Sequence, residues 1–157
     1  MNKNTDWKSC VDSLTAKKIK PDEEKIKSLL KASKRKLESE ERLGMDEVTS
    51  TSKFSLAYES LRELLEALAI KNGYKIYNHE CYTYFLKEVL NQSEKGDDFD
   101  AIRKVRNGVN YYAKELPPQQ AEKIIKQAKE LRNFINKLLE ENISNKENRK
   151  KSSTENA

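Results

Sequence analysis

The sequence predicts an all-α fold, an antiparallel up-and-down helical bundle with extra N-terminal helices. Only four glycines and three prolines interrupt its 157 residues, which favours long helices over turns. Apolar residues recur at the i, i+3, i+4, i+7 spacing of helix faces in consecutive segments separated by short loops, as in an antiparallel bundle. Charged and hydrophobic residues each make up 36% of the chain, a balance typical of thin amphipathic helices with solvated outer faces.

Residues 1–47 are expected to form N-terminal helices that pack on the bundle. The short first helix carries apolar residues at helical spacing: Trp7, Cys10, Val11 and Leu14. A second helix begins after Pro21, where Asp22 and the two following glutamates favour the positive end of the helix dipole. Its narrow apolar stripe comprises Ile26, Leu29, Leu30 and Leu37. The run Lys34–Lys36 of this helix is interpreted as a solvated face.

Residues 48–143 are predicted to form the bundle itself. Met45–Lys53 is predicted to be a linker in which Thr49–Ser52 offers several N-caps for the third helix. That helix has the most regular apolar face of the chain: Phe54, Ala57, Tyr58, Leu61, Leu64, Leu65 and Leu68. Asn72–Gly73 ends it, and Gly73 is expected to take the left-handed conformation at the C-terminal cap.

Three more segments complete the predicted chain. Asn78 is expected to cap a fourth helix that carries Tyr82, Phe85, Leu86, Val89 and Leu90. Gly96–Asp98 is predicted to be a break, followed by a fifth helix from about Asp98 to Lys114. Pro117 and Pro118 then start a sixth helix with a long stripe of Ile124, Ile125, Ala128, Leu131, Ile135, Leu138 and Leu139. Residues 144–157 lack large apolar side chains and are expected to form a disordered basic tail.

Charge and cysteine usage limit the class of protein. The formal net charge of +5 is compatible with a nucleic-acid partner without requiring one. Cys10 and Cys81 stand alone, with no CxxC spacing, which favours a reduced, cytoplasmic protein. The first six residues have no apolar signal region, and no apolar run approaches the roughly 20 residues of a membrane span.

The sequence indicates no metal site and no cofactor. His79 is the one histidine, and a structural zinc ion takes four ligands, so a capping or surface role is expected for it. The chain has no Gly-rich phosphate loop, no HExxH motif and no serine nucleophile motif. Neighbouring tyrosines such as Tyr74 and Tyr77 are expected to pack the loop and the fourth helix.

The fifth helix has an unusual polar face. At about 100° per residue, its apolar residues Ile102, Val105, Val109 and Tyr112 fall on one side. The opposite side carries Arg103, Arg106, Asn107 and Asn110, with no acid among them and with Tyr111 at the margin. Arginines beside amides bind phosphate and hydrogen-bond bases or ribose. The alternative is an ordinary exposed polar face.

This face leads to expectations for individual residues. Tyr112 is expected in the core, and Tyr111 is expected to reach the polar surface. Gly108 is expected to permit the close approach of another helix, either within the chain or across a dimer interface. Arg106 and Tyr111 lie about 140° apart on an ideal helix, so they are expected to converge only if the helix deforms or a second subunit contributes. Glu66 and Glu80 are candidate ion-pair partners of Arg106.

The run Arg106–Tyr112 resembles the signature of the HEPN superfamily, the higher eukaryote and prokaryote nucleotide-binding domains. The preceding segments Ala57–Leu68, Gly73–Tyr74 and His79–Glu80 are similar to that family too, so the resemblance covers roughly residues 50–142. It implies a bundle that homodimerises, with the motif helices meeting across the two-fold axis.

The resemblance also implies two kinds of activity. Many members are metal-independent RNases, often toxins, with a signature Arg, a polar residue and a His four to six residues after the Arg. Others bind RNA or nucleotides without catalysis, often as partners of a minimal nucleotidyltransferase. Arg106 and Asn107 match the first two positions, whereas Tyr111 and Tyr112 occupy the His positions. Tyrosine titrates near 10 and is a poorer general base than histidine, which favours binding over catalysis.

Three hypotheses follow. The first is a dimeric HEPN-like protein that binds RNA or nucleotide through Arg103, Arg106, Asn107, Asn110 and Tyr111, within a toxin–antitoxin-like pair that includes a nucleotidyltransferase-family protein. The second is a divergent metal-independent endoribonuclease in which Arg106 stabilises charge and Tyr111 acts as the acid. The third is a noncatalytic scaffold that dimerises at Gly108.

Overall fold

The computed structural model describes residues 5–155, without the side chains of residues 142–146. The elements are, in chain order, α1 (Trp7–Asp12), β1 (Ala16–Lys18), α2 (Glu23–Arg42), α3 (Ser50–Lys71), β2 (Tyr74–Ile76), α4 (Glu80–Tyr84), the π-helical segment η1 (Phe85–Val89), α5 (Ser93–Tyr112) and α6 (Pro118–Glu155). The predicted all-α class is confirmed in its main feature, because the described chain is mostly helical with one small sheet.

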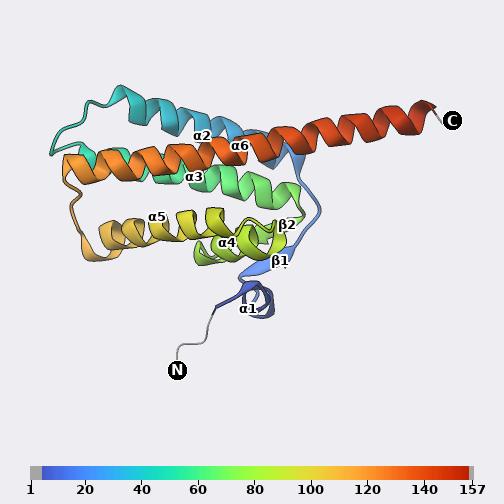
Figure 1. Ribbon diagram of the computed structural model, residues 1–157, viewed down its shortest axis with the longest axis horizontal. Helices are drawn as coiled ribbons and strands as arrows, with labels where there is room; N and C mark the ends of the chain where they lie inside the picture. Colours follow the sequence, from blue (N-terminus) through green and yellow to red (C-terminus); the bar gives the residue numbers. More distant parts are fainter. Residues whose placement is uncertain (1–4, 156–157) are drawn as a thin grey trace.

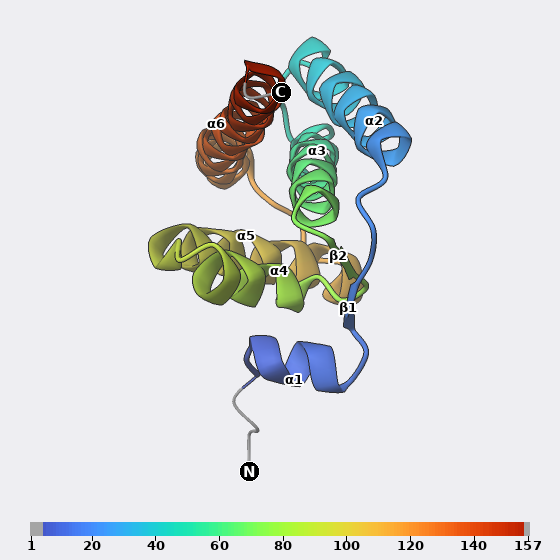
Figure 2. The same ribbon diagram turned by 90° about the vertical axis from the view of Figure 1, so that its right-hand side faces the viewer.

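The helices form two layers with α1 outside them. In Figure 2, α2, α3 and α6 make one layer, α4 and α5 lie beneath α3, and α1 lies on the far side of α4. In Figure 1, α2 and α3 run side by side in opposite directions, and α6 lies along α3. α3 is the central helix, since it contacts α2, α5 and α6.

The sequence pattern of α3 explains its central place. All seven residues of its predicted apolar face are buried, with exposed fractions of 3% or less. The predicted stop is also confirmed, because Gly73 has a φ of 84° directly after the cap residue Asn72. A side chain is rarely compatible with this left-handed conformation. Helix α3 starts at Ser50, inside the predicted linker.

Helices α2 and α6, which lie beside α3, follow their predicted patterns. In α2, the Asp22 carboxylate caps the first turn by accepting a hydrogen bond from the Lys25 backbone N–H at 3.0 Å. In α6, the residues of the predicted stripe are buried or partly buried against the core. A polar contact then joins the three helices: Arg132 donates to Ser60 Oγ at 2.9 Å and to Ser33 Oγ at 3.3 Å. These serines let α2 and α3 approach closely.

A two-stranded sheet and a disulfide attach α1 to the bundle. Strands β1 and β2 pair antiparallel, with Ala16 opposite Ile76 and Lys18 opposite Tyr74. Cys10 and Cys81 form a disulfide with Cα atoms 6.0 Å apart. The expectation of two unpaired cysteines, on which the cytoplasmic prediction partly depended, is therefore wrong. Their separation of 71 positions hides the pairing in the sequence. No helix in the described part of the chain is apolar over a length that would cross a membrane.

The sequence predicted a break at Gly96–Asp98, but these residues lie inside α5, which begins at Ser93. Gly96 is fully buried among its neighbours, and a Cβ atom there would lie 2.9 Å from the Thr83 carbonyl oxygen and also collide with the Lys87 side chain. Glycine is thus needed for the close packing of α5 on the preceding helical turns, not for a turn of its own.

The two glycines of α5 are expected to respond oppositely to alanine. Gly96→Ala should lower the free energy of unfolding by roughly 1–3 kcal/mol, because the added methyl group meets backbone. Gly108→Ala should raise it by up to about 1 kcal/mol, because alanine favours a helix interior and the nearest atom is the flexible Lys114 Cδ at 3.3 Å. Urea denaturation of both variants measures this, and shifts of the same sign would contradict the packing described.

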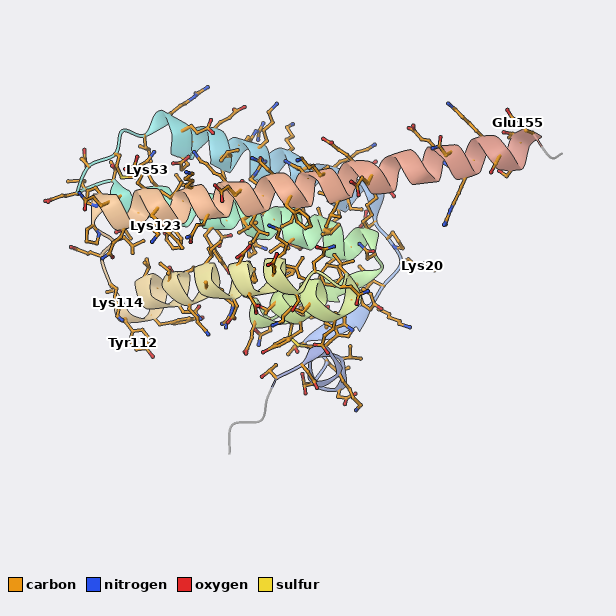
Figure 3. The ribbon with its side chains drawn as sticks, in the orientation of Figure 1. Lys20, Lys53, Tyr112, Lys114, Lys123 and Glu155 are labelled. Carbon is orange, nitrogen blue, oxygen red and sulfur yellow. A yellow bond between two sulfur atoms is a disulfide. The ribbon has the colours of Figure 1, made fainter. Side chains whose placement is uncertain are left out.

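The expected disorder of residues 144–157 is wrong for the part that the structure describes. Helix α6 continues to Glu155 and projects past the other helices, as Figure 1 and Figure 3 show. No glycine or proline lies between residues 119 and 155, so nothing in the backbone chemistry stops the helix. Residues 156–157 lie outside the described chain.

Candidate functional site

The predicted polar face of α5 opens onto a cavity of about 540 Å³, here called the Arg106 cavity. Three segments of chain line it. Thr15 precedes β1, Tyr77–Glu80 follows β2, and α5 contributes Arg103, Arg106, Asn107 and Tyr111. Four of the five residues predicted to bind RNA or nucleotide therefore meet at one place, together with a loop that the sequence had not linked to them.

Arg106 is the charged centre of this cavity. Its guanidinium carbon lies 5.5 Å from the centroid of the Tyr58 ring and 6.0 Å from that of Tyr111. Among the described residues it makes no salt bridge. Of its two candidate partners, Glu66 pairs with Arg62 at 2.9 Å, and Glu80 lines the cavity without an ion pair to Arg106. Asn110, the fifth predicted residue, does not line the cavity. With its amide oxygen turned toward Arg106, it accepts from Nε at 3.0 Å and from Nη2 at 3.1 Å.

Arg103 differs from Arg106 because an acid neutralises it. Its Nη2 lies 2.6 Å from Asp100 Oδ1, one helical turn earlier, and Lys104 also pairs with that carboxylate at 3.0 Å. Partial burial raises the pKa of Asp100, but the hydrogen bonds from Arg103 and Lys104 outweigh it and leave this pKa below its ordinary value. The expectation of two uncompensated arginines therefore holds for Arg106 alone.

Arg106 and Tyr111 converge within one chain, contrary to the geometric expectation. Helix α5 is continuous from Ser93 to Tyr112, so no deformation at Gly108 is involved. The long Arg106 side chain reaches along the helix to the Tyr111 ring. The angle of about 140° between the two residues describes their backbone positions and not the reach of the side chain. Within the described part of the chain, a Cβ atom at Gly108 would meet the Lys114 side chain and no other helix, and the predicted dimer role of Gly108 stays a prediction.

The two tyrosines of the motif are both at the surface. Tyr111 is 71% exposed, as expected, but Tyr112 is 76% exposed, so its predicted core position is wrong. Tyr112 is the last residue of α5, and Ala113 turns the chain away with a φ of 49°. Figure 3 shows Tyr112 and Lys114 at the lower left corner of the molecule, at the end of α5. The helical period placed Tyr112 on the apolar face, but it does not show whether a neighbouring helix covers that face at the end of α5.

His79 is the site residue that sequence reasoning missed. Its Nδ1 is hydrogen-bonded to Tyr58 Oη at 2.9 Å, and its half-buried ring lines the Arg106 cavity. The capping role falls to Asn78, whose Oδ1 accepts from the Glu80 N–H at 2.9 Å. Burial lowers the pKa of His79 below its ordinary value of 6.5, and the positive charges of Arg106 and Arg62 lower it further. Nothing in the sequence marks the contact with Tyr58, which depends on tertiary packing.

The lowered pKa of His79 gives a prediction. Its ring should titrate with a midpoint below 6.5, and Arg106→Ala should raise that midpoint by removing a nearby positive charge. Because the unfolded chain takes up this proton first, the contribution of His79 to stability is present above pH 6.5 and is lost as the pH falls toward the folded pKa. A proton NMR titration of the imidazole measures the midpoint, and a value at or above 6.5 would contradict the described environment.

The cavity combines groups that suit an anion with aromatic walls. It offers the Arg106 guanidinium, which has no ion pair among the described residues, the His79 imidazole, an amide at Asn107 and the exposed ring of Tyr111, beside the carboxylate of Glu80. No group of three or more His, Cys, Asp or Glu side chains within the described residues is placed to hold a metal ion. Comparison of the chain with protein-family models, with curated proteins and with solved structures found no match.

Proposed function

We propose that the protein binds RNA or a nucleotide at the Arg106 cavity, with a phosphate group on Arg106 and an unpaired base on the neighbouring tyrosines. One observation carries the proposal: an arginine that makes no salt bridge with any described residue lines a cavity whose rim holds exposed aromatic rings. A guanidinium forms paired hydrogen bonds with phosphate oxygens, and base stacking on an aromatic ring needs no particular sequence.

The environment of Arg106 supports phosphate rather than a protein carboxylate as its partner. The group is half-buried and held from two sides, by the Asn110 oxygen and by the Tyr58 ring. Little side-chain entropy remains to be lost when an anion binds, so the cavity is preorganised. When Tyr58 Oη donates to His79 Nδ1, the neutral ring keeps an Nε2–H that donates to a phosphate or sugar oxygen without charge repulsion from Arg106.

The ring positions support an unpaired base. Tyr77 is 56% exposed and Tyr111 is 71% exposed, and the two come from different segments of the cavity wall. An exposed ring at a cavity edge gives a flat surface on which a base can stack, whereas the bases of a duplex are already stacked on one another. Single-stranded RNA or a free nucleotide is therefore the proposed ligand class.

The fold and assembly expected from the HEPN resemblance remain part of the proposal. The alternating directions of α2 and α3 and the exposed outer end of α5 are compatible with a HEPN-like up-and-down bundle. In a homodimer, the partly exposed segment around Gly108 is the proposed contact between the two copies of α5. A nucleotidyltransferase-family protein is the proposed second partner, as in a toxin–antitoxin-like pair.

The two tyrosines of the motif provide a matched test. Tyr111→Ala should weaken binding of a short single-stranded RNA by about 1–3 kcal/mol, because one stacking surface is lost. Tyr112→Ala removes an equally exposed ring that does not line the cavity, so it should leave the affinity within about twofold. Fluorescence anisotropy with labelled RNA measures both, and equal effects of the two substitutions would remove Tyr111 from the site.

His79 favours a second function, metal-independent RNA cleavage. In the tautomer whose Nδ1–H donates to Tyr58 Oη, the neutral imidazole has Nε2 free to take the proton of a ribose 2′-hydroxyl. The O2′ atom then attacks phosphorus, the bond from phosphorus to O5′ breaks, and the O5′ atom takes up a proton. The products are a 2′,3′-cyclic phosphate and a 5′-hydroxyl, with Arg106 stabilising the added negative charge.

RNA cleavage in the absence of metal ions distinguishes the nuclease hypothesis from binding alone. Purified protein should cleave single-stranded RNA in the presence of a chelator, and His79→Asn should abolish cleavage while RNA binding persists. Tyr111→Phe tests the acid role of that hydroxyl, since phenylalanine keeps the stacking ring. Absence of cleavage by the wild-type protein under conditions where it binds RNA would leave binding as the function.

A further inference from the structure

We propose that the Cys10–Cys81 disulfide controls ligand binding at the Arg106 cavity, so that reduction by a dithiol weakens binding. This inference depends on the proposed function, because it concerns the regulation of the same cavity. The disulfide does not line the Arg106 cavity. It holds the two chain segments that form the wall opposite α5.

Each of the two chain segments opposite α5 lies within a few residues of one cysteine of the disulfide. Cys81 lies two residues after His79, and Asn78–Glu80 lines the cavity. On the other side, Thr15 follows Cys10 by five residues, and its hydroxyl donates to the Cys10 carbonyl oxygen at 3.1 Å. The same hydroxyl oxygen lies 3.4 Å from Cys81 Sγ, so Thr15 touches both ends of the disulfide.

A backbone contact carries this link into the cavity wall. The Tyr77 N–H donates to the Thr15 carbonyl oxygen at 2.8 Å, next to the Ala16–Ile76 pair of the small sheet. Any movement of Thr15 is therefore transmitted to Tyr77, and through Asn78 to His79. The position of the imidazole relative to Arg106 thus depends on an intact connection between α1 and α4.

Few other contacts hold α1. It is six residues long and lies outside the two helical layers, as Figure 2 shows. A helix this short is not stable alone in water. Trp7 packs against Tyr74 and Phe85, with ring centroids 5.2 and 5.9 Å away, and its backbone N–H donates to Glu88 Oε2 at 2.8 Å. After reduction, these two ring contacts, the hydrogen bond to Glu88 and the pairing of the three-residue strand β1 with β2 remain to hold the wall.

The disulfide borders a second cavity, but Cys10 and Cys81 are only 1% and 2% exposed, so α1 must move before a reductant reaches the sulfur atoms. This cavity of about 720 Å³ is lined by both cysteines and by polar residues of α1 and its flanks, and it shares Thr15, Asn78 and Glu80 with the Arg106 cavity. A thiolate of the dithiol attacks one cysteine sulfur and breaks the S–S bond, which gives a mixed disulfide. The second thiol then displaces the other cysteine. The protein gains two electrons and two protons, and the dithiol becomes a disulfide.

The test compares oxidised and reduced protein in the same RNA-binding assay. Reduction should weaken binding of single-stranded RNA roughly tenfold, if the fraction of molecules with an ordered wall falls to about one tenth. Cys10→Ser should bind like reduced wild type and should not respond to the dithiol. Equal affinity of oxidised and reduced wild type would overturn the proposal, as would loss of most helical circular dichroism on reduction, because the effect would then be global unfolding.

Hydrogen exchange separates this inference from the proposed function. Reduction should accelerate exchange of the Tyr77 amide, which is bonded to Thr15, and leave the amides of α3 protected. If neither redox state binds RNA or nucleotide, the proposed function fails, and unchanged exchange at Tyr77 then overturns the control of the wall as well. Faster exchange at Tyr77 together with weaker RNA binding is the combined result that supports it.

Discussion

Arg106→Ala is expected to weaken binding of single-stranded RNA roughly 10- to 100-fold, the loss that corresponds to a charge-assisted hydrogen-bonded contact. Arg106 is the cavity arginine without a salt bridge among the described residues, so its charge is available to a phosphate. Arg106→Lys keeps the charge but lacks the planar pair of donors and should fall between the wild type and the alanine variant. Fluorescence anisotropy at several salt concentrations measures the affinities.

Arg35→Ala is the matched control for this substitution. It removes the same charge from an exposed position on α2, outside the cavity. The slope of log K against log salt should decrease in magnitude by about 0.7 in Arg106→Ala and remain unchanged in Arg35→Ala, because one phosphate contact is lost only in the first. Equal losses in the two variants would show that net charge, and not the cavity, drives binding.

Phe99→Ala is expected to lower the free energy of unfolding by about 3–5 kcal/mol. The Phe99 ring is fully buried between two buried tyrosines: it stacks on Tyr58 at 6.2 Å and meets the edge of Tyr82 at 6.1 Å. Its loss leaves a cavity at the contact between α3 and α5. Urea denaturation followed by circular dichroism measures the change.

The same substitution should also disturb the site. Phe99 supports the Tyr58 ring, and Tyr58 holds both His79 and Arg106, so RNA affinity should fall even where the protein remains folded. Val48→Ala is the control, because Val48 is 88% exposed and its truncation should change stability by less than about 0.5 kcal/mol. A Phe99→Ala variant as stable as Val48→Ala would contradict the described core.

The sequence predicts those parts of the fold that depend on local periodicity and capping. α3 and α6 are long, regular and free of internal breakers, so their buried faces could be found from spacing alone. Gly73 acts where predicted because cap chemistry depends on one turn of chain, and α2 starts at the predicted acids, with Asp22 as its N-cap. Gly96 was misjudged as a break because a glycine needed for close packing has the same sequence signal as one needed for a turn.

The parts not predicted depend on contacts between residues far apart in the chain. The sheet pairs residues near 17 with residues near 75, and the disulfide joins cysteines 71 positions apart. The hydrogen bond between His79 and Tyr58 joins the segment before α4 to α3. No periodicity marks such pairs. Half of the candidate site, the polar face of α5, was therefore visible in the sequence, and the opposite wall with His79 was not.

One measurement tests the central claim most directly. The chain has one histidine, so the His79 ring gives a single set of imidazole signals in a proton NMR spectrum. We predict that single-stranded RNA shifts these signals in the wild-type protein and, at the same concentrations, leaves them in place in Arg106→Ala. RNA binding that leaves the His79 signals of the wild-type protein unchanged would contradict the claim, because the ligand would then lie outside the Arg106 cavity.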